Sequence, residues 1–328
     1  MRKLCRDLLW LLSGGIEKTI RQRNELKTQL AATHVALDKS RNRERFLEEK
    51  FNRVSLAQPL PFIMLNTLPK SGSVYLTESL RLGLGIPVKQ ISPGYVPMDL
   101  ADYRRLAEGA IGNTIAQAHL DANPTNLRLL AEYSPRMVLH LRDPRQALLS
   151  WIHHVKGFAA RGRLSDALVT PLPPVALFNQ NFSALIDWHL AHHFINLLDW
   201  MERWLAHAES GLRPNLLISQ FEDLRHDAHA TIYRLLDFYG IPRWMYDPQD
   251  IPHTHETHFR KGELDEWREV FNPVQQSICA EFMAGYPRLN RLYGGEENFQ
   301  NNRKELPANQ SVVVERNGYA ECVSVKNA

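Results

Sequence analysis

The strongest constraint on the fold of this chain is an apolar stretch that turns sharply on small residues and continues into a helix. Residues 61–68 form an apolar run typical of a buried strand, and Pro69-Lys70-Ser71-Gly72-Ser73 follows as a tight turn. Residues 74–84 can continue as a helix. Backbone N–H groups at such a turn and at a helix start favour an anion, and Lys70 adds a positive charge. The sequence therefore predicts an α/β fold with a phosphate cradle.

The order of residues in this turn differs from the loop that binds nucleoside triphosphates. That loop reads G-x-x-x-x-G-K-[ST], and its last hydroxyl holds Mg²⁺. Here Lys70 precedes Gly72, and Thr67 stands where the first glycine would be. Taken alone, the segment is either an ordinary strand-to-helix turn or a cradle for another phosphate ligand.

A second strand-to-helix junction carries an arginine. Residues 138–141 predict a short buried strand, Arg142 follows it, and Asp143-Pro144 suits a helix start, with Asp as N-cap and Pro in the first turn. Open α/β sheets bind ligands at the carboxyl ends of their strands, which makes Arg142 a candidate contact. Ser150 lies about two helical turns further on and projects the same way. The alternative is a surface arginine and a helix-facing serine.

Two later segments add to this pattern. In Arg260-Lys261-Gly262, the arginine can fork onto phosphate oxygens and the glycine lets the backbone come close. Residues 216–224 predict a late strand that carries Phe221, whose ring can stack on a base, and a helix over residues 228–239 follows.

Taken in order, these segments resemble the sulfotransferases that use 3′-phosphoadenosine 5′-phosphosulfate (PAPS). Within that family, the chain resembles the bacterial-type members that have a cytosolic-type sulfotransferase domain. The resemblance covers residues 62–291 and departs from the family at Asp265-Glu266, where Gly-Asp usually precedes the tryptophan, and at Phe221, often a tyrosine. It implies no metal, because cationic side chains take the role of Mg²⁺. The nucleotide-binding residues that it implies are Lys70, Ser71, Gly72, Ser73, Val74, Tyr75, Arg142, Ser150, Phe221, Thr254, Arg260, Lys261 and Gly262.

The resemblance also implies a catalytic pair. Sulfuryl transfer needs a base that titrates near neutrality, usually histidine. The family carries its base in Lys-x-His-Leu, which matches Gln117-Ala118-His119-Leu120, so His119 is the expected base and Gln117 replaces an auxiliary lysine. Lys70 is implied to stabilise charge on the departing diphosphate. The alternative for His119 is a strand-end histidine that bonds a backbone carbonyl.

Two histidine clusters invite a metal-site interpretation. His189, His192 and His193 have i, i+3, i+4 spacing, but they lie in residues 182–208, which we interpret as a core-packing helix. The alternating histidines of residues 253–258 precede Arg260, and we expect a loop near the nucleotide there. We expect no metal site.

Charge, cysteine spacing and the N-terminal apolar run indicate the partners and the location of the protein. The chain of 328 residues has a net charge of +3, which gives no polyanion signature, and we expect no nucleic-acid partner. Its three cysteines are widely spread and make no disulfide framework, which favours a reducing compartment. The apolar run near Leu8 is too short for a signal peptide or a spanning helix. We therefore predict a cytoplasmic protein without a transmembrane segment.

We predict three parts: a helical arm over residues 1–57, a sulfotransferase domain over residues 58–295, and a flexible tail over residues 296–328. The arm has an imperfect coiled-coil seam, which can pair two chains or fold back on the domain. Its apolar positions are Ile16, Leu26, Leu30, Leu37, Leu47, Phe51 and Val54.

The predicted fold is a three-layer, P-loop-like α/β domain with a mostly parallel sheet, preceded by the helical arm. The predicted function is sulfuryl transfer from PAPS to an alcohol, phenol or amine, such as a small molecule or a glycan or lipid hydroxyl. The acceptor pocket is expected around residues 91–103 and 158–180. Two alternatives remain: a P-loop nucleotide-dependent kinase, and a non-catalytic coiled-coil protein on this fold.

Overall fold

A computed structural model describes residues 22–45, 59–94, 99–167, 171–251 and 261–294. The chain divides into two units, Met1–Pro59 and Leu60–Ala328. The predicted boundary near residue 57, and the predicted tail from residue 296, lie outside the described residues.

In the first unit, residues 22–45 form a helix. Its apolar side chains stand in solvent within this single chain: Leu26, Leu30 and Leu37 are 64%, 58% and 47% exposed. These three leucines belong to the predicted seam, whereas its other apolar positions lie outside the described residues. Pairing with a second copy stays a prediction.

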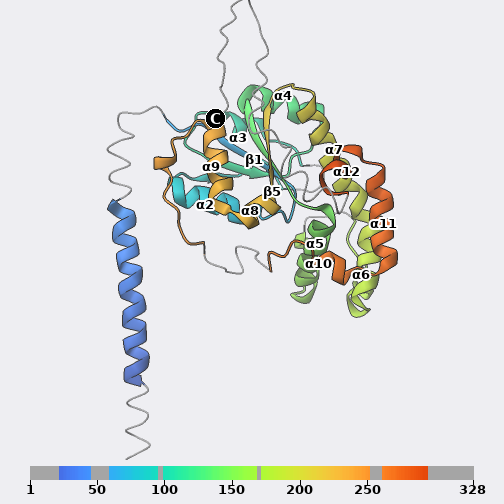
Figure 1. The fold of residues 1–328 in the computed structure, drawn as a ribbon, viewed down its shortest axis with the longest axis horizontal. Coiled ribbons are helices and arrows are strands. Elements are labelled where there is room, and N and C mark those ends of the chain that lie inside the picture. The colour runs from blue at the N-terminus through green and yellow to red at the C-terminus, as the bar shows by residue number, and fades with distance from the viewer. Residues whose placement is uncertain (1–21, 46–58, 95–98, 168–170, 252–260, 295–328) are drawn as a thin grey trace, which may run out of the picture. The chain divides into compact units, whose positions relative to one another are not determined.

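The second unit is built on a parallel sheet of five strands in the order β2-β3-β1-β4-β5 (Figure 1). The sheet is parallel at every pairing, with Leu65 of the central strand opposite Gln117 on one side and Val138 on the other. The carboxyl ends of β1, β3 and β4 therefore meet at one edge. The strands are β1 (Ile63–Thr67), β2 (Val88–Lys89), β3 (Ile115–Ala118), β4 (Arg136–Leu141) and β5 (Asn215–Gln220).

Helices cover both faces of this sheet, which gives the three layers that the sequence predicts. In the view of Figure 1, α2, α8 and α9 lie on one side and α5, α6, α7, α11 and α12 on the other. The helices are α2 (Ser73–Leu84), α3 (Tyr103–Ala110), α4 (Pro124–Tyr133), α5 (Pro144–Ala160), α6 (Phe182–His189), α7 (Ile195–Glu209), α8 (Phe221–His226), α9 (Ala228–Tyr239), α10 (Glu266–Val270), α11 (Pro273–Ala284) and α12 (Pro287–Tyr293).

Helices pack on both faces of the sheet. Met64 and Leu139 belong to one buried cluster with Trp200 and Trp204 of α7, whose indole N–H groups both donate to the carbonyl of Leu120 at 2.9 and 2.8 Å. On the other side, α9 is tied to the central strand by the hydroxyl of its Tyr239, which donates to the carbonyl of Met64 at 2.8 Å. These ties hold α7 against the residue that follows β3, and α9 against the central strand β1.

Local sequence signals explain several helix boundaries. The side chain of Asp143 caps α5 by accepting from the N–H of Arg145 at 2.8 Å, and Pro144 occupies the first turn. The helix expected over residues 182–208 is interrupted by a π-helical turn, Leu190–Phe194, between α6 and α7. The strand expected over residues 216–224 is wrong in its second half: β5 covers Asn215–Gln220, and Phe221 begins α8.

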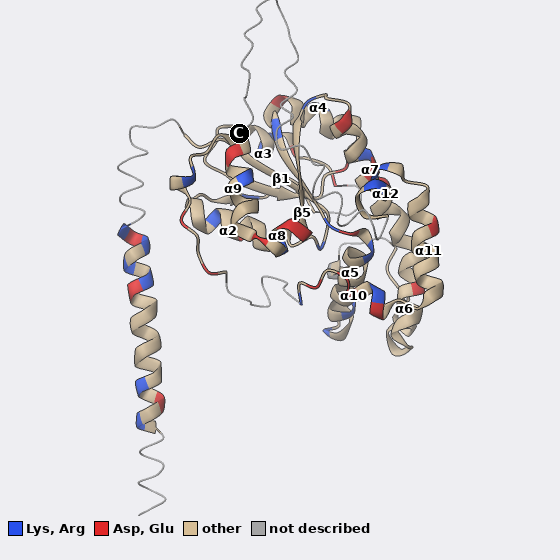
Figure 2. Ribbon diagram, viewed as in Figure 1, with Lys and Arg blue, Asp and Glu red and all other residues tan. Residues whose placement is uncertain are grey.

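Acidic and basic residues are interspersed over the helices of the second unit (Figure 2). None of the described helices is long and apolar enough to cross a bilayer.

Candidate active site

The turn after β1 is held in an unusual backbone conformation. Lys70 and Gly72 both have positive φ, 66° and 82°, in the left-handed region that non-glycine residues rarely adopt. Gly72 is the N-cap of α2, and no side chain among the described residues caps that helix. The first N–H groups of α2 are therefore available to an anion, as the sequence predicts for a phosphate cradle.

The ring of Phe221 packs against Gly72 in this turn. A Cβ added at Gly72 would lie 2.8 Å from two ring carbons of Phe221, closer than real contacts allow. Only glycine fits here, both for its positive φ and for the ring beneath it. The aromatic ring expected near an adenine thus packs against the turn of residues 69–73, which we call the phosphate turn after its predicted role.

Arg142 links the turn to the segment after residue 261. Its Nη1 donates to the carbonyl of Lys70 at 2.8 Å, and its Nη2 donates to the carbonyl of Glu263 at 2.5 Å. Its guanidinium lies over the ring of Phe221, 3.9 Å from the centroid. Arg142 is buried, so its charge acts in a poorly solvated place next to the cradle.

His140 supports the turn from the neighbouring strand. Its Nε2 donates to the carbonyl of Ser71 at 2.9 Å, and its Nδ1 accepts from the hydroxyl of Ser219 at 3.0 Å. Burial lowers the pKa of His140 from 6.5 to about 4, against the opposing effect of the Ser71 carbonyl. The ring is therefore neutral at physiological pH and serves as a fixed support.

His119 lies directly after β3, at the same edge of the sheet. Its Nδ1 is 2.6 Å from the carbonyl oxygen of Thr67. Since a carbonyl only accepts, Nδ1 carries the hydrogen and Nε2 carries the lone pair. The amide nitrogen of Gln117 donates to the hydroxyl of Thr67 at 3.0 Å and lies 3.4 Å from His119 Nε2. The carbonyl contact and a role as base thus use different nitrogens of one ring.

The surroundings of His119 tune its basicity. Burial is the largest influence and lowers the pKa below 6.5. The Thr67 carbonyl and the charge of Asp99 raise it, whereas the charge of Lys70 lowers it. A lowered pKa keeps the ring neutral, and able to accept a proton, at neutral pH.

One cavity of about 1060 Å³ gathers most of the predicted residues. Its walls come from the phosphate turn, from the ends of β3 and β4, and from α5, α8 and the residues after 247. The predicted residues that line it are Lys70, Gly72, Ser73, Val74, Tyr75, His119, Arg142, Ser150, Phe221, Lys261 and Gly262.

Of the predicted residues that the structure describes, Ser71 alone does not line this cavity. Ser71 is fully buried, is absent from the cavity lining, and meets His140 through its carbonyl. Thr254 and Arg260 lie outside the described residues. The placement of these two stays a prediction.

The cavity also contains residues that the sequence did not single out for it. Trp151 and His154 line it from α5, and Arg225 and His229 line it from α8 and α9. The signal for His154 was its spacing of four residues from Ser150, which places the two one helical turn apart on one face. Trp151 directly follows Ser150 and had no such signal. For Arg225 and His229 no local pattern existed, because the sheet order brings their helices to the cavity.

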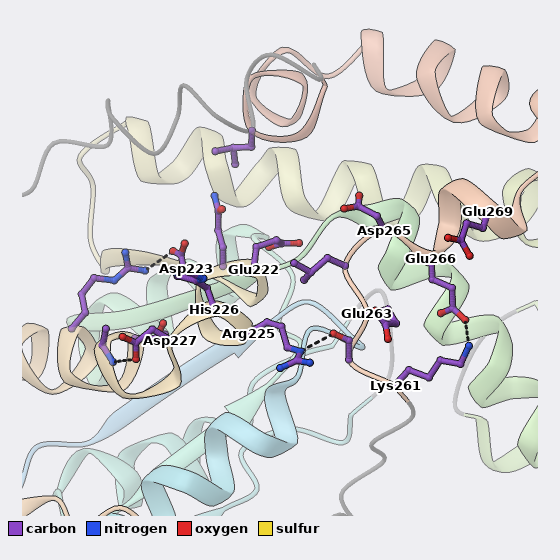
Figure 3. A pocket seen from close by; sticks show the side chains of 17 residues that line it. Glu222, Asp223, Arg225, His226, Asp227, Lys261, Glu263, Asp265, Glu266 and Glu269 are labelled. Carbon is purple, nitrogen blue, oxygen red and sulfur yellow. Dashed lines mark hydrogen bonds and ion pairs between the residues drawn. The ribbon is translucent and has the colours of Figure 1, made fainter.

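A second cavity, of about 1040 Å³, shares Arg225, Lys261 and Gly262 with the first. Figure 3 shows the side chains that line this second cavity. Lys261 pairs with Glu266 in the lining of this cavity, at 2.9 Å between Nζ and Oε1. The Nε of Arg225 donates to the carbonyl of Gly262 at 3.2 Å. Its acidic lining residues are Glu222, Asp223, Asp227, Glu263, Asp265, Glu266 and Glu269.

Comparison with known proteins supplies the family. A 3-alpha-hydroxysteroid sulfotransferase of Cavia porcellus is 25% identical, over 70% of this chain and 86% of that protein. A mouse sulfotransferase structure complexed with PAP matches at TM-score 0.48 and 16% identity, covering 74% of this chain and 88% of that one. A sulfotransferase structure from Alicyclobacillus acidocaldarius matches at TM-score 0.44 and 14% identity, covering 73% and 97%. The family model described as "Sulfotransferase domain" matches residues 36–247, more than half of the chain, and the chain therefore belongs to the sulfotransferase domain family.

Proposed function

We propose that this enzyme transfers the sulfuryl group of PAPS to a hydroxyl or amine acceptor by in-line displacement. The observation that carries the proposal is the convergence of Lys70, His119 and Arg142 on one cavity at the carboxyl edge of the sheet. A base, a cation beside a phosphate turn, and a second cation on a neighbouring strand are the groups that this reaction needs.

The cavity residues fit a nucleotide with two phosphate groups. The turn supplies backbone N–H groups and Lys70 to a 5′-phosphosulfate, while its glycine leaves no side chain in the way. Arg142, Ser150 and Lys261 line the cavity as candidates for a 3′-phosphate. Arg260 and Thr254 complete the proposed set from outside the described residues.

The proposed reaction moves one proton and exchanges one bond at sulfur. His119 Nε2 takes the proton of the acceptor hydroxyl as the acceptor oxygen forms its bond to sulfur. The bond between sulfur and the 5′-phosphate oxygen breaks, and its electron pair stays on that oxygen. Lys70 stabilises the negative charge that builds there. Cationic side chains suffice for this charge, so the proposal includes no metal.

The remaining proposals concern context. The arm, residues 1–57, is proposed to pair two copies, and the domain is proposed to span residues 58–295. A cytoplasmic location is proposed from the cysteines: Cys279, the cysteine within the described residues, is a free buried thiol. The acceptor is proposed to be a small molecule or a glycan or lipid hydroxyl.

Thermal unfolding with different nucleotides, followed by a transfer assay, tests the proposal. We expect adenosine 3′,5′-diphosphate (PAP) to raise the unfolding temperature of the full chain more than ATP does, because it carries the 3′-phosphate. Sulfur-labelled PAPS with a panel of alcohols, phenols and amines then identifies the acceptor. A rise with ATP and Mg²⁺ and none with PAP would favour a kinase, and no rise with either would favour a non-catalytic protein.

A further inference from the structure

The segment from Lys261 to Trp267 forms a shared wall between the two cavities. Lys261 and Gly262 line both cavities, whereas Glu263 and Glu266 line only the acidic one. The position of this segment therefore decides where the ammonium group of Lys261 stands relative to a nucleotide.

Residues at and just before the start of α5 hold the segment at both ends. Near its beginning, Arg142 Nη2 donates to the carbonyl of Glu263 at 2.5 Å. At its end, the backbone N–H of Trp267 donates to Oε1 of Gln146 at 3.0 Å. The guanidinium of Arg145 lies over the indole of Trp267, 4.0 Å from the ring centroid.

Glutamine at position 146 carries a cost in folding free energy. The residue is fully buried, and its Nε2 has no hydrogen-bond partner among the described residues. Burial of an amide donor without a partner is unfavourable, and a methionine of similar volume would avoid it. What glutamine supplies, and methionine cannot, is the oxygen that accepts from Trp267.

Glu266 connects the contact between Gln146 and Trp267 to the position of Lys261. Glu266 directly precedes Trp267, and its side chain is mostly buried, with 10% of its surface exposed. Its Oε1 holds the ammonium group of Lys261 at 2.9 Å. Docking of the Trp267 backbone on Gln146 therefore places Glu266, and Glu266 places Lys261.

We propose that Gln146 is a positioning residue for 3′-phosphate recognition, a role that rests on the proposed function. It does not line the cavity and touches no nucleotide; it acts by fixing the end of segment 261–267. With the segment docked, Lys261 and Gly262 stand beside the 3′-phosphate in one arrangement. Without the Gln146 oxygen, the same residues must be ordered when the nucleotide binds, which weakens binding.

The test measures how strongly the full chain prefers a 3′-phosphate. Calorimetry gives the dissociation constants of PAP and of AMP, which lacks that group, for the wild type and for Gln146→Met. We expect the preference for PAP to fall by about tenfold in Gln146→Met, the size of one charge-assisted contact, while the affinity for AMP changes by less than about twofold. An unchanged preference in a folded Gln146→Met protein overturns the proposal.

Two variants separate positioning from a general packing effect. Trp267→Phe keeps the backbone N–H and an aromatic ring for Arg145, and the indole Nε1 that it removes has no partner among the described residues. We expect its preference for PAP to equal that of the wild type. Gln146→Glu keeps an acceptor oxygen but buries a carboxylate, and we expect its preference for PAP to exceed that of Gln146→Met. A loss in Trp267→Phe equal to that in Gln146→Met would show a packing effect and contradict the proposal.

A second measurement serves if Gln146→Met does not fold. Hydrogen exchange on the wild type should show that PAP slows exchange of the backbone amides in residues 261–267 more than AMP does; equal protection by both would overturn the proposal. Two results distinguish failure of the proposed function from failure of the role of Gln146. A wild type that binds PAP and AMP equally contradicts the proposed function, whereas a wild-type preference that survives Gln146→Met contradicts only the role of Gln146.

Discussion

The imidazole Nδ1 of His119 lies 2.6 Å from the carbonyl oxygen of Thr67, the last residue of the central strand. This contact fixes the tautomer, because the carbonyl needs a donor. It also joins β3 to β1 at the point where the phosphate turn begins. The proposed base and the proposed anion site are therefore held by the same strand end.

Replacement of His119 by alanine should abolish turnover and spare nucleotide binding. The base acts on the acceptor proton, so we expect kcat to fall by about 10²- to 10⁴-fold while the affinity for PAP stays within about twofold. A weakly acidic alcohol is the right acceptor, since a phenol depends less on a base. Near full kcat in this variant would place the base elsewhere, and His154, which lines the same cavity, would be the next residue to test.

Lys70→Ala is the matched contrast, and we expect it to damage both kcat and PAP affinity. The charge of Lys70 faces the proposed phosphosulfate in the ground state and in the transition state. Unchanged PAP affinity in this variant would contradict the cradle.

Gly72→Ala should impair the site through a clash that a control glycine lacks. An added Cβ would meet the ring of Phe221 at 2.8 Å, at a φ of 82°. At Gly211, φ is 65° and nothing lies within 4 Å of an added Cβ, so Gly211→Ala shares the backbone strain alone. We expect each variant to lose about 1 kcal/mol of stability from strain. Only Gly72→Ala should also weaken PAP binding, and equal PAP affinities in the two variants would contradict the role of the turn.

His140 should make the fold sensitive to acid. Its pKa is about 4 in the folded protein and 6.5 as the ordinary value, so the unfolded chain binds the proton more readily. The contribution to the free energy of unfolding is complete above about pH 6.5 and is lost as the pH falls towards 4; it amounts to about 3 kcal/mol. Urea unfolding between pH 7 and 4.5 measures it.

The matched variant is His140→Gln, whose amide can still donate to Ser71 but does not titrate. We expect its unfolding free energy to fall less steeply with acid than that of the wild type. His189 and His193 also have pKa values lowered by burial, to about 3 and about 4, and they contribute equally to both proteins. Parallel pH curves for the two proteins would show that His140 is not responsible.

The arm should govern assembly and not chemistry. Leu30 and Leu37 are exposed on the helix of residues 22–45 and share one seam position. We expect the double variant Leu30→Glu with Leu37→Glu to lower the mass seen by light scattering, with PAP affinity unchanged. Val35→Glu is the control, because Val35 is also exposed but lies off the seam. Equal masses for all three proteins would contradict pairing through this seam.

The sequence could predict the parts of the site that depend on local chemistry. The Asp143-Pro144 pair predicts the start of α5. The helix expected over residues 228–239 has the same bounds as α9. The left-handed turn follows from a glycine between small residues. Each of these rests on neighbours in the chain.

What could not be predicted depends on contacts between distant segments. Arg142 reaches the carbonyl of Lys70 because β4 pairs with β1, and the strand order is not written in any local pattern. The family pattern predicts a strand through Phe221, whereas Phe221 begins α8 and its ring packs against Gly72 of a distant turn.

The most direct measurement compares the binding of PAPS with that of adenosine 5′-phosphosulfate, which lacks only the 3′-phosphate, by calorimetry on the full chain without acceptor. Arg142, Ser150 and Lys261 line the cavity and are the residues that we propose for that group, and loss of a single charge-assisted contact costs about 10- to 150-fold in affinity. We predict that PAPS binds at least about tenfold more tightly. Equal affinities for the two nucleotides would contradict a PAPS site in this cavity.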